Sequence, residues 1–580
     1  MDARELRIRE QLEYLYEPEA AERAFAGIRG LMEDFAGKQR LPRGGRDRFT
    51  EKDAVLITYG DQVRSADNTP LRTGSEFLKN TVGDEVSIVH LLPFFPYSSD
   101  DGFAVKDYRS VNPDYGNWAD VQELGKNFDL MFDAVINHVS RQSKWFRRYR
   151  KGDPGYENFF LEVDEDWDLS RVVRPRDNPL TVEVEVEGEE KKLWSTFSSD
   201  QLDLNYGNPE VLLRIVDLLL FYVGQGAKII RLDAIAYLWK KPGTTCIHLE
   251  ETHKVIRLFR AVLDSVAPDV ALITETNVPH EQNVSYFGDG TNEAQLVYQF
   301  PLPPLVLDAF ITGDAGRLRD WVGDLEYPAS EATFFNFLAS HDGIGLRPVE
   351  GILTDRAIDR MVERTRQHGG YVSYRADPEG GSSPYELNIS YFDALSDPES
   401  EERRELQVRR FLCSQAIMLA LRGVPGIYFH SLFGSRNWKQ GVEKTGRKRS
   451  INRKKLELSR LRRELNDRNS VRSRVLRGYK ELLSGRKSSS AFHPGAEQVV
   501  VDAGSEIFAI LRRPSGSEKP VLCLHNITGE SQSLSPASLE GVEITGPELE
   551  DLITGRSFAM DKSGEIGLSP CEFLWLREVG

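Results

Sequence analysis

Three carboxylates in this sequence stand where apolar runs break off, and together they could cleave a glycosidic bond. They are Asp233, Glu275 and Asp342. Cleavage of a glycosidic bond uses two carboxyl groups, because one attacks the anomeric carbon while the other protonates the departing oxygen. An Asp at the end of a strand is usually a turn or cap former, so none of the three is informative alone. In this order along one chain, they predict a glycoside-cleaving enzyme.

The residues around these carboxylates predict a role for each. Arg231 and Asp233 are two positions apart on one expected strand, so both side chains point to the same side. The guanidinium would hold Asp233 ionised as a nucleophile, although an Arg-x-Asp pair is more often a surface ion pair. Glu275, close to other negative charges, should keep its proton and act as the general acid. Asp342 would bind two sugar hydroxyls as the ring flattens.

Three histidines also fall at expected strand ends. They are His90, His138 and His341, from a total of ten. A single histidine in such a place is usually structural. Three at one barrel mouth favour hydroxyl ligands around a sugar, because a neutral imidazole both donates and accepts hydrogen bonds.

Eight short apolar runs must position these groups, and helix-like segments lie between several of them. Runs that are apolar throughout are typical of strands buried on both faces in a closed parallel barrel. The C-terminal strand ends of such a barrel carry its working residues. The runs are 55–59, 86–92, 130–136, 227–232, 270–274, 296–300, 334–338 and 424–429. The fold class predicted is therefore α/β, a (β/α)8 barrel.

Two gaps between the runs are too long for simple connections. Residues 139–202 contain the alternating segment Thr181–Val186 and predict a subdomain inserted after the third strand. Residues 343–395 predict a second insertion after the seventh strand, and the Gly/Ser-rich stretch 377–384 within it predicts a mobile loop. From about residue 490, alternating segments separated by turn residues predict an antiparallel β domain. The expected division is 1–50 (helical extension and linker), 51–138, 203–342 and 396–488 (three parts of the barrel), 139–202 and 343–395 (insertions), and 489–580 (C-terminal β domain).

Composition narrows the class of partner. The chain has 580 residues, 28% of them charged, and a formal net charge of −16. This charge argues against nucleic acid and against docking on anionic lipid, and any anionic substrate must meet a local basic pocket. The four cysteines lack metal-site spacing and are expected to be reduced and buried, so no metal site is expected. An acidic N-terminus and the absence of a long apolar stretch predict a cytoplasmic location.

The strand-end segments resemble those of the α-amylase superfamily, and more closely those of its sucrose-phosphorylase branch. The similar segments are Leu56–Asp61, Val89–Phe95, Ser340–Gly345 and Ser450–Arg453. The resemblance runs from about residue 50 to the end of the chain. It implies Asp233 as nucleophile, Glu275 as acid/base and Asp342 as stabiliser of the transition state. It also implies that Asp61, His90, His138, Arg231, His341 and Arg453 surround the glucosyl unit, and that Tyr385 lies in a mobile loop that admits phosphate.

Within that branch, the segments Cys246–Glu250 and Glu275–His280 and the N-terminal helices resemble the group that acts on glucosylglycerate. The implied reaction is phosphorolysis of 2-O-(α-D-glucosyl)-D-glycerate, with retention, to α-D-glucose 1-phosphate and D-glycerate. Phosphate would be a co-substrate and no cofactor is implied. Basic groups are needed to offset the incoming dianion, and Arg141 and Lys144 are the candidates. For these two, a solvated surface position is an equal alternative.

Several other functions remain open from the sequence. The acceptor could be sucrose, sucrose 6′-phosphate or glycerol instead of glycerate. The same carboxylates could serve an α-glucosidase or a transglucosidase that needs no phosphate. An inactive barrel that serves as a binding subunit is disfavoured, because Asp233 and Glu275 are both present. The expected partners are therefore a small sugar and phosphate, and a homodimer stays open.

Overall fold

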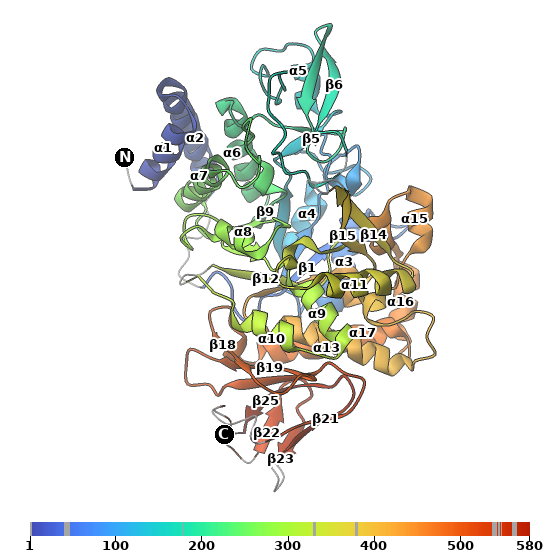
Figure 1. Cartoon of the computed structure of the whole chain (residues 1–580). Coiled ribbons are helices and arrows are strands. Elements are labelled where there is room, and N and C mark those ends of the chain that lie inside the picture. The colour runs from blue at the N-terminus through green and yellow to red at the C-terminus, as the bar shows by residue number, and fades with distance from the viewer. Residues whose placement is uncertain are drawn as a thin grey trace.

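A closed barrel of eight parallel strands forms the centre of the protein, as the sequence predicted (Figure 1). The computed structural model describes residues 3–39, 47–176, 178–328, 332–376, 381–535, 542, 544, 546, 548–559 and 565–579. In order around the barrel, the strands are β1 (Val55–Thr58), β3 (Ile88–Leu91), β4 (Asp129–Ala134), β9 (Ala227–Leu232), β10 (Ala271–Thr274), β11 (Leu296–Tyr298), β12 (Thr333–Phe337) and β16 (Val424–Tyr428). Each lies within, or within one residue of, one of the eight apolar runs.

The strands are apolar on both faces because side chains fill the barrel inside and helices cover it outside. The main helices are α3 (Pro70–Val82), α4 (Trp118–Gly125), α6 (Pro209–Gly224), α7 (Glu250–Val266), α9 (Leu302–Thr312), α10 (Gly316–Gly323), α13 (Arg404–Ala420) and α17 (Val471–Lys487). Helix α6 shows how the local sequence sets such an element. Asn208 caps it by accepting from the Glu210 N–H at 3.0 Å, and Pro209 stands in its first turn, where a missing N–H costs nothing.

Two insertions rise above the C-terminal ends of the strands. The first contains β5 (His138–Ser140), α5 (Lys144–Tyr149), β6 (Thr181–Val186), β7 (Glu189–Trp194) and β8 (Gln201–Asp203). The second contains β13 (Ile344–Gly345), α11 (Asp355–Gln367), β14 (Tyr371–Ala376), β15 (Ser382–Asn388) and α12 (Tyr391–Leu395). The predicted mobile loop lies partly outside the described residues, at 377–380. Smaller elements complete this end: β2 (Val63–Arg64), α8 (His280–Val284), α14 (Phe429–Leu432), α15 (Lys439–Thr445), β17 (Leu456–Glu457) and α16 (Leu458–Asn466).

The N-terminal residues form two helices, α1 (Ala3–Leu15) and α2 (Pro18–Lys38), which lie beside α7 and α6 (Figure 1). Their apolar face joins the main core through residues such as Leu12 and Phe25. The hydroxyl of Tyr16 donates to the backbone oxygen of Tyr206 at 2.9 Å. The expected linker after α2 falls mostly in residues 40–46, outside the described residues.

The C-terminal region is an antiparallel sheet with two buried faces, in agreement with the prediction. Its strands, in spatial order, are β18 (Glu497–Val501), β19 (Ile507–Arg513), β20 (Val521–Asn526), β25 (Phe573–Glu578), β22 (Glu548–Asp551) and β23 (Ser557–Ala559), and a separate pair is formed by β21 (Gln532–Leu534) and β24 (Ile566–Leu568). Along β19, Phe508 and Ile510 join the main core, whereas Ala509 and Leu511 join a second apolar cluster. This alternation follows from the two-residue period of a strand.

A buried arginine ties this sheet to the barrel. Arg512 on β19 is fully buried and donates to the carbonyl oxygens of Ala491, Ala420 and His493 at 3.0–3.1 Å. Ala420 ends α13, so one guanidinium satisfies three carbonyl oxygens and links the C-terminal sheet to a helix of the barrel. All four cysteines are buried and unpaired. Within the described ranges, every helix falls short of the length and apolar character that crossing a bilayer requires.

Replacing Arg512 by Ala should lower the free energy of unfolding by about 3 kcal/mol or more, because each buried carbonyl left without a donor costs roughly 1–3 kcal/mol. Urea unfolding followed by tryptophan fluorescence would measure the change. Arg513→Ala is the matched control, because Arg513 is the next residue on β19 and its part-exposed side chain pairs with Glu497 at 3.1 Å. Equal losses in the two variants would contradict the bridging role of Arg512.

Candidate active site

The three carboxylates predicted from the sequence line one pocket of about 80 Å³ at the C-terminal mouth of the barrel. Asp233 follows β9 and Glu275 follows β10. The strand register pairs Leu232 with Thr274, so the two carboxylates are next neighbours across adjacent strands. Asp342 reaches the same pocket from the loop after β12. Positions far apart in the sequence therefore surround one space large enough for part of a sugar.

The guanidinium of Arg231 connects the carboxylates. On β9 it lies 2.7 Å from Asp233 and 3.8 Å from Glu275, and it also pairs with Asp133 on β4. Its side chain is only 2% exposed. Glu275 accepts a further hydrogen bond from the backbone N–H of Ala234 at 3.0 Å. The expected ion pair between Arg231 and Asp233 is thus present, but it is shared.

This sharing changes the expected ionisation. Burial raises the pKa of Asp233 to about 8, and the nearby charges of Glu275 and Asp133 add to the rise against the pull of Arg231. Burial also raises the pKa of Glu275, with Asp342 adding to it. Arg231 lowers the pKa of Asp233, but burial, together with the charges of Glu275 and Asp133, outweighs it. Asp233 and Glu275 titrate as one pair that holds a proton well above the usual pH range of carboxylates.

Asp342 is in the opposite state. Burial opposes its ionisation, but the charge of Arg449 and smaller contributions from His341 and Arg453 outweigh burial and hold its pKa well below the usual range. Arg449 pairs directly with Asp342 and also lies 3.0 Å from Glu386. A fixed negative charge thus stands beside a pair that shares a proton. Within that pair the proton can lie on Glu275, the acid, while Asp233 carries the negative charge that a nucleophile requires.

Two of the three predicted histidines face the pocket. His138 and His341 line it, and the ring of His341 stacks on Phe103 at 4.9 Å between centroids. Burial lowers the pKa of both, to about 3 for His341, so both rings are neutral near pH 7. His138 Nε2 lies 3.0 Å from the carbonyl oxygen of Phe103. His90 instead contacts Asp133 at 2.6 Å, fully buried behind the pocket.

The other predicted sugar ligands surround this pocket without all lining it. Arg453 lies 3.7 Å from Asp342 and donates to the backbone oxygen of His341 at 2.7 Å. Asp61 is held between Lys455 and Arg64, each at 2.6 Å, and does not line this pocket. Tyr385 on β15 lines the pocket.

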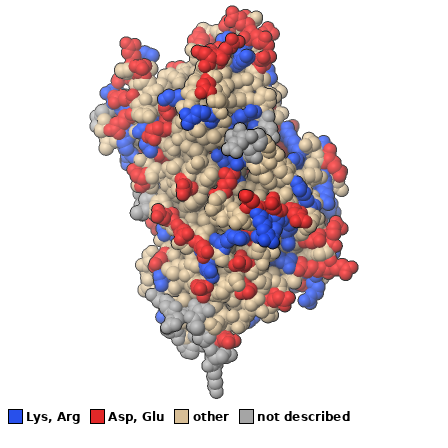
Figure 2. Space-filling model, viewed as in Figure 1, with Lys and Arg blue, Asp and Glu red and all other residues tan. Residues whose placement is uncertain are grey.

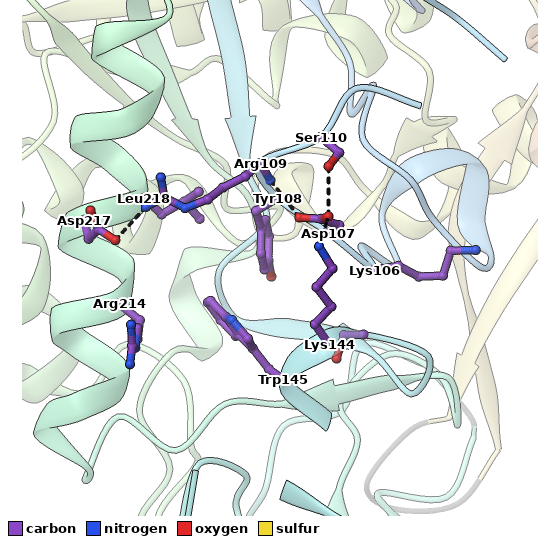
Figure 3. A pocket seen from close by; sticks show the side chains of 11 residues that line it. Lys106, Asp107, Tyr108, Arg109, Ser110, Lys144, Trp145, Arg214, Asp217 and Leu218 are labelled. Atoms are coloured by element: carbon purple, nitrogen blue, oxygen red, sulfur yellow. Dashed lines mark hydrogen bonds and ion pairs between the residues drawn. The ribbon is translucent and has the colours of Figure 1, made fainter. Parts of the chain in front are cut away.

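The phosphate candidates lie elsewhere. Lys144 begins α5, pairs with Asp107 at 2.6 Å and lines a different pocket (Figure 3). Arg141 does not line the catalytic pocket either. The chain turns outward after β5, so closeness to His138 in sequence does not bring these two cations to the carboxylates. Arg176 and Arg449 line the pocket in their place.

The sequence reasoning missed both of these arginines. Arg449 precedes the quoted segment Ser450–Arg453 by one residue, so that motif could have indicated it. Arg176 lies in an irregular part of the first insertion that carries no periodicity. Its guanidinium lies 3.7 Å from Asp100 and 5.7 Å from the ring centroid of Phe197. Among the described residues, no group of three or more His, Cys, Asp or Glu side chains could hold a metal ion.

Known proteins similar to this chain identify its family and its fold. The family of the alpha-amylase catalytic domain matches residues 81–315. A solved structure, the sucrose 6F-phosphate phosphorylase from Thermoanaerobacter thermosaccharolyticum, superposes with a TM-score of 0.71 at 26% identity, over 82% of this chain and 94% of that one. The chain belongs to the alpha-amylase family of (β/α)8-barrel enzymes.

More similar in sequence are relatives named glucosylglycerate phosphorylase. The protein from Spirochaeta thermophila is 48% identical, over 98% of both chains. The one from Escherichia coli K12 is 44% identical, over 93% of this chain and 95% of its own. A glucosylglycerol phosphorylase from Marinobacter adhaerens is more distant, at 26% identity over 69% of this chain.

Glu275→Gln and Asp233→Ala should differ on α-glucosyl fluoride, since fluoride leaves without a proton. Asp233→Ala should lose activity on fluoride and natural α-glucoside alike, whereas Glu275→Gln should keep the fluoride reaction. With the glucoside, wild-type kcat/KM should fall as pH rises through the raised pKa of Glu275, because the acid must be protonated. In Glu275→Gln with fluoride that alkaline fall should be absent.

Stopped assays across pH would measure this, and Asp320→Ala, an exposed carboxylate, serves as the control. Substantial glucoside turnover by both active-site variants, with circular dichroism unchanged, would contradict the assigned roles.

Proposed function

We propose that this chain is a retaining phosphorylase that cleaves 2-O-(α-D-glucosyl)-D-glycerate with phosphate, giving α-D-glucose 1-phosphate and D-glycerate. Three relatives named glucosylglycerate phosphorylase, 44–48% identical over 93–98% of the chain, support the substrate. Relatives named sucrose phosphorylase are 28–30% identical over 69–79% of the chain. The substrate is therefore taken from the group that matches almost the whole chain.

The reaction would run by double displacement. Asp233 attacks the anomeric carbon while Glu275 gives its proton to the departing glycerate oxygen, so a β-glucosyl ester forms on Asp233 and D-glycerate leaves. A phosphate oxygen then attacks the same carbon, and Glu275 takes the proton from that phosphate group. The ester bond to Asp233 breaks, and α-D-glucose 1-phosphate leaves with retained configuration. Asp342, ionised beside Arg449, would bind the sugar hydroxyls throughout.

The observation that carries the phosphate step is the basic side of the pocket. Arg176 and Arg449 line it together with Glu275 and Tyr385. Both the glycerate carboxylate and phosphate are anions that must approach three carboxylates, and guanidinium groups offset that repulsion by bidentate hydrogen bonds. Of the two, Arg449 is already bound to Asp342 and Glu386, so we assign Arg176 the more direct contact with the anion.

The approach to the pocket is also basic. A wider cavity of about 650 Å³ adjoins it, and its lining includes Arg447, Lys448 and Arg453 as well as the two arginines. The chain as a whole has a net charge of −16, and Figure 2 shows acidic side chains gathered at the end that carries β6. A local cationic entrance on an acidic protein would draw small anions to the site that uses them.

In the reverse direction, α-D-glucose 1-phosphate offered with a panel of acceptors should glucosylate D-glycerate best. The acceptor carboxylate would meet the arginines, which neutral acceptors do not engage. Release of phosphate measures each rate. Glycerol, fructose and fructose 6-phosphate are the competing acceptors. A clear preference for any of them would contradict D-glycerate as the acceptor.

Arg176→Leu should raise the KM for phosphate about tenfold or more, since a hydrogen bond to a charged group contributes roughly 1.5–3 kcal/mol. Hydrolysis of α-glucosyl fluoride without phosphate should change much less, because water needs no cation. The matched control is Arg171→Leu, an exposed arginine of the same insertion that donates to the Gly243 oxygen at 3.2 Å. If both reactions fell in parallel in Arg176→Leu, its role would be structural.

A further inference from the structure

A buried lysine that the catalytic assignment does not use lies close to the catalytic pocket. The side chain of Lys240, in the segment after β9, is only 2% exposed. Its ammonium contacts the carboxylate of Asp203 on β8 at 2.5 Å and donates to the side-chain oxygen of Asn137 at 2.8 Å. Asp203 and Asn137 are fully buried. Lys240 does not line the catalytic pocket, so it can affect a bound sugar only through another residue.

The contacts of Lys240 and Asp203 fix the orientation of the Asn137 amide. An ammonium has only N–H donors, and an ionised carboxylate has only acceptors. The amide oxygen must therefore face Lys240, and the amide nitrogen, which donates to Asp203 at 3.0 Å, must face the carboxylate. Asp203 is itself held in place, because it accepts from the backbone N–H and the hydroxyl of Thr196 at 2.9 and 2.7 Å. Asn137 thus has one orientation that satisfies both charged neighbours.

The fixed amide in turn selects the tautomer of His138. The Asn137 side-chain nitrogen lies 3.2 Å from His138 Nδ1, and because that nitrogen can only donate, Nδ1 must accept. The single proton of the neutral ring therefore lies on Nε2, which donates to the carbonyl oxygen of Phe103 at 3.0 Å. Gln201 donates to the same carbonyl at 3.2 Å. Phe103 and Gln201 line the catalytic pocket with His138, so the Nε2 edge is the one that a sugar hydroxyl can reach.

A buried ion pair thus controls a pocket histidine from outside the pocket. We propose that Lys240 and Asp203 are positioning residues that act through Asn137 to hold His138 as an Nε2–H donor toward the glucosyl unit. The inference rests on the proposed glucosyl transfer in this pocket, but not on phosphate or D-glycerate as co-substrates. Without the two charges the Asn137 amide is free to turn. Its oxygen would then accept from Nδ1–H, and His138 Nε2 could only accept.

A double-mutant cycle with α-glucosyl fluoride tests this coupling. Lys240→Met/Asp203→Asn removes both charges together, so no unpaired buried charge remains. This variant should lower kcat/KM about tenfold, because a hydrogen bond to the sugar is lost. In a His138→Ala background the same two substitutions should change kcat/KM by less than about twofold, because the residue through which they act is missing. Equal losses in the two backgrounds would overturn the proposal, since a general loss of packing does not depend on His138.

The matched control is Lys241→Met. Lys241 is the next residue, but its side chain is exposed and pairs with Glu251 at 3.5 Å. This variant should keep the wild-type kcat/KM. A loss as large as that of Lys240→Met/Asp203→Asn would contradict the proposal, because the effect would then belong to the segment and not to the buried pair.

Nitrogen NMR of the full chain with isotope-labelled histidine reads the tautomer directly. The ring signals of His138 are those that disappear in His138→Ala. We expect a proton on Nε2 and none on Nδ1 in the wild type, and a mixture of both tautomers in Lys240→Met/Asp203→Asn. A proton on Nδ1 in the wild type, or an unchanged Nε2–H form in the variant, would refute the proposal. This measurement needs no turnover, so a wild type inactive on α-glucosyl fluoride would contradict the proposed function and leave the tautomer to be decided by NMR.

Discussion

The positive charge of Arg231 makes it possible to bury three carboxylates together in this active site. Asp133, Asp233 and Glu275 are buried within contact distance of its guanidinium, and buried carboxylates are very costly without a cation among them. The four residues come from three adjacent strands, so the electrostatic balance holds only in the observed register. A shift of one residue in β9 would turn Arg231 to the other face. Closure of the barrel and compensation of charge are therefore one structural requirement.

A second arginine gives the carboxylates their different states. Asp342 is ionised because the charge of Arg449 outweighs its burial, while the Asp233–Glu275 pair keeps a proton because burial outweighs the charge of Arg231. Similar side chains in one small pocket thus acquire opposite behaviour from the balance between burial and neighbouring charge. Such separation of pKa values is what allows one group to donate a proton while another holds a negative charge.

The strands were predictable from the sequence, and the loops were not. Each barrel run is apolar throughout because burial on both faces demands it, and a carboxylate at the end of such a run must lie at the mouth. Asp233 and Glu275 could be placed together on that basis. The same reasoning failed for Lys144, whose distance from the carboxylates depends on how the chain turns after β5. The position of Arg176 could not be predicted for the same reason, since the residues of an irregular loop follow no period.

This division has a consequence for specificity. The nucleophile and the acid lie at strand ends, where the barrel fixes them, whereas Arg176, Tyr385 and Arg449 come from insertions and connecting segments above the mouth. Chemistry at the anomeric carbon then depends on the barrel, and the choice of acceptor depends on segments that can change without disturbing it. Relatives named sucrose phosphorylase and glucosylglycerol phosphorylase, 29% and 26% identical to this chain, fit this arrangement. Substituting loop cations should accordingly alter which anion is used before it alters bond cleavage.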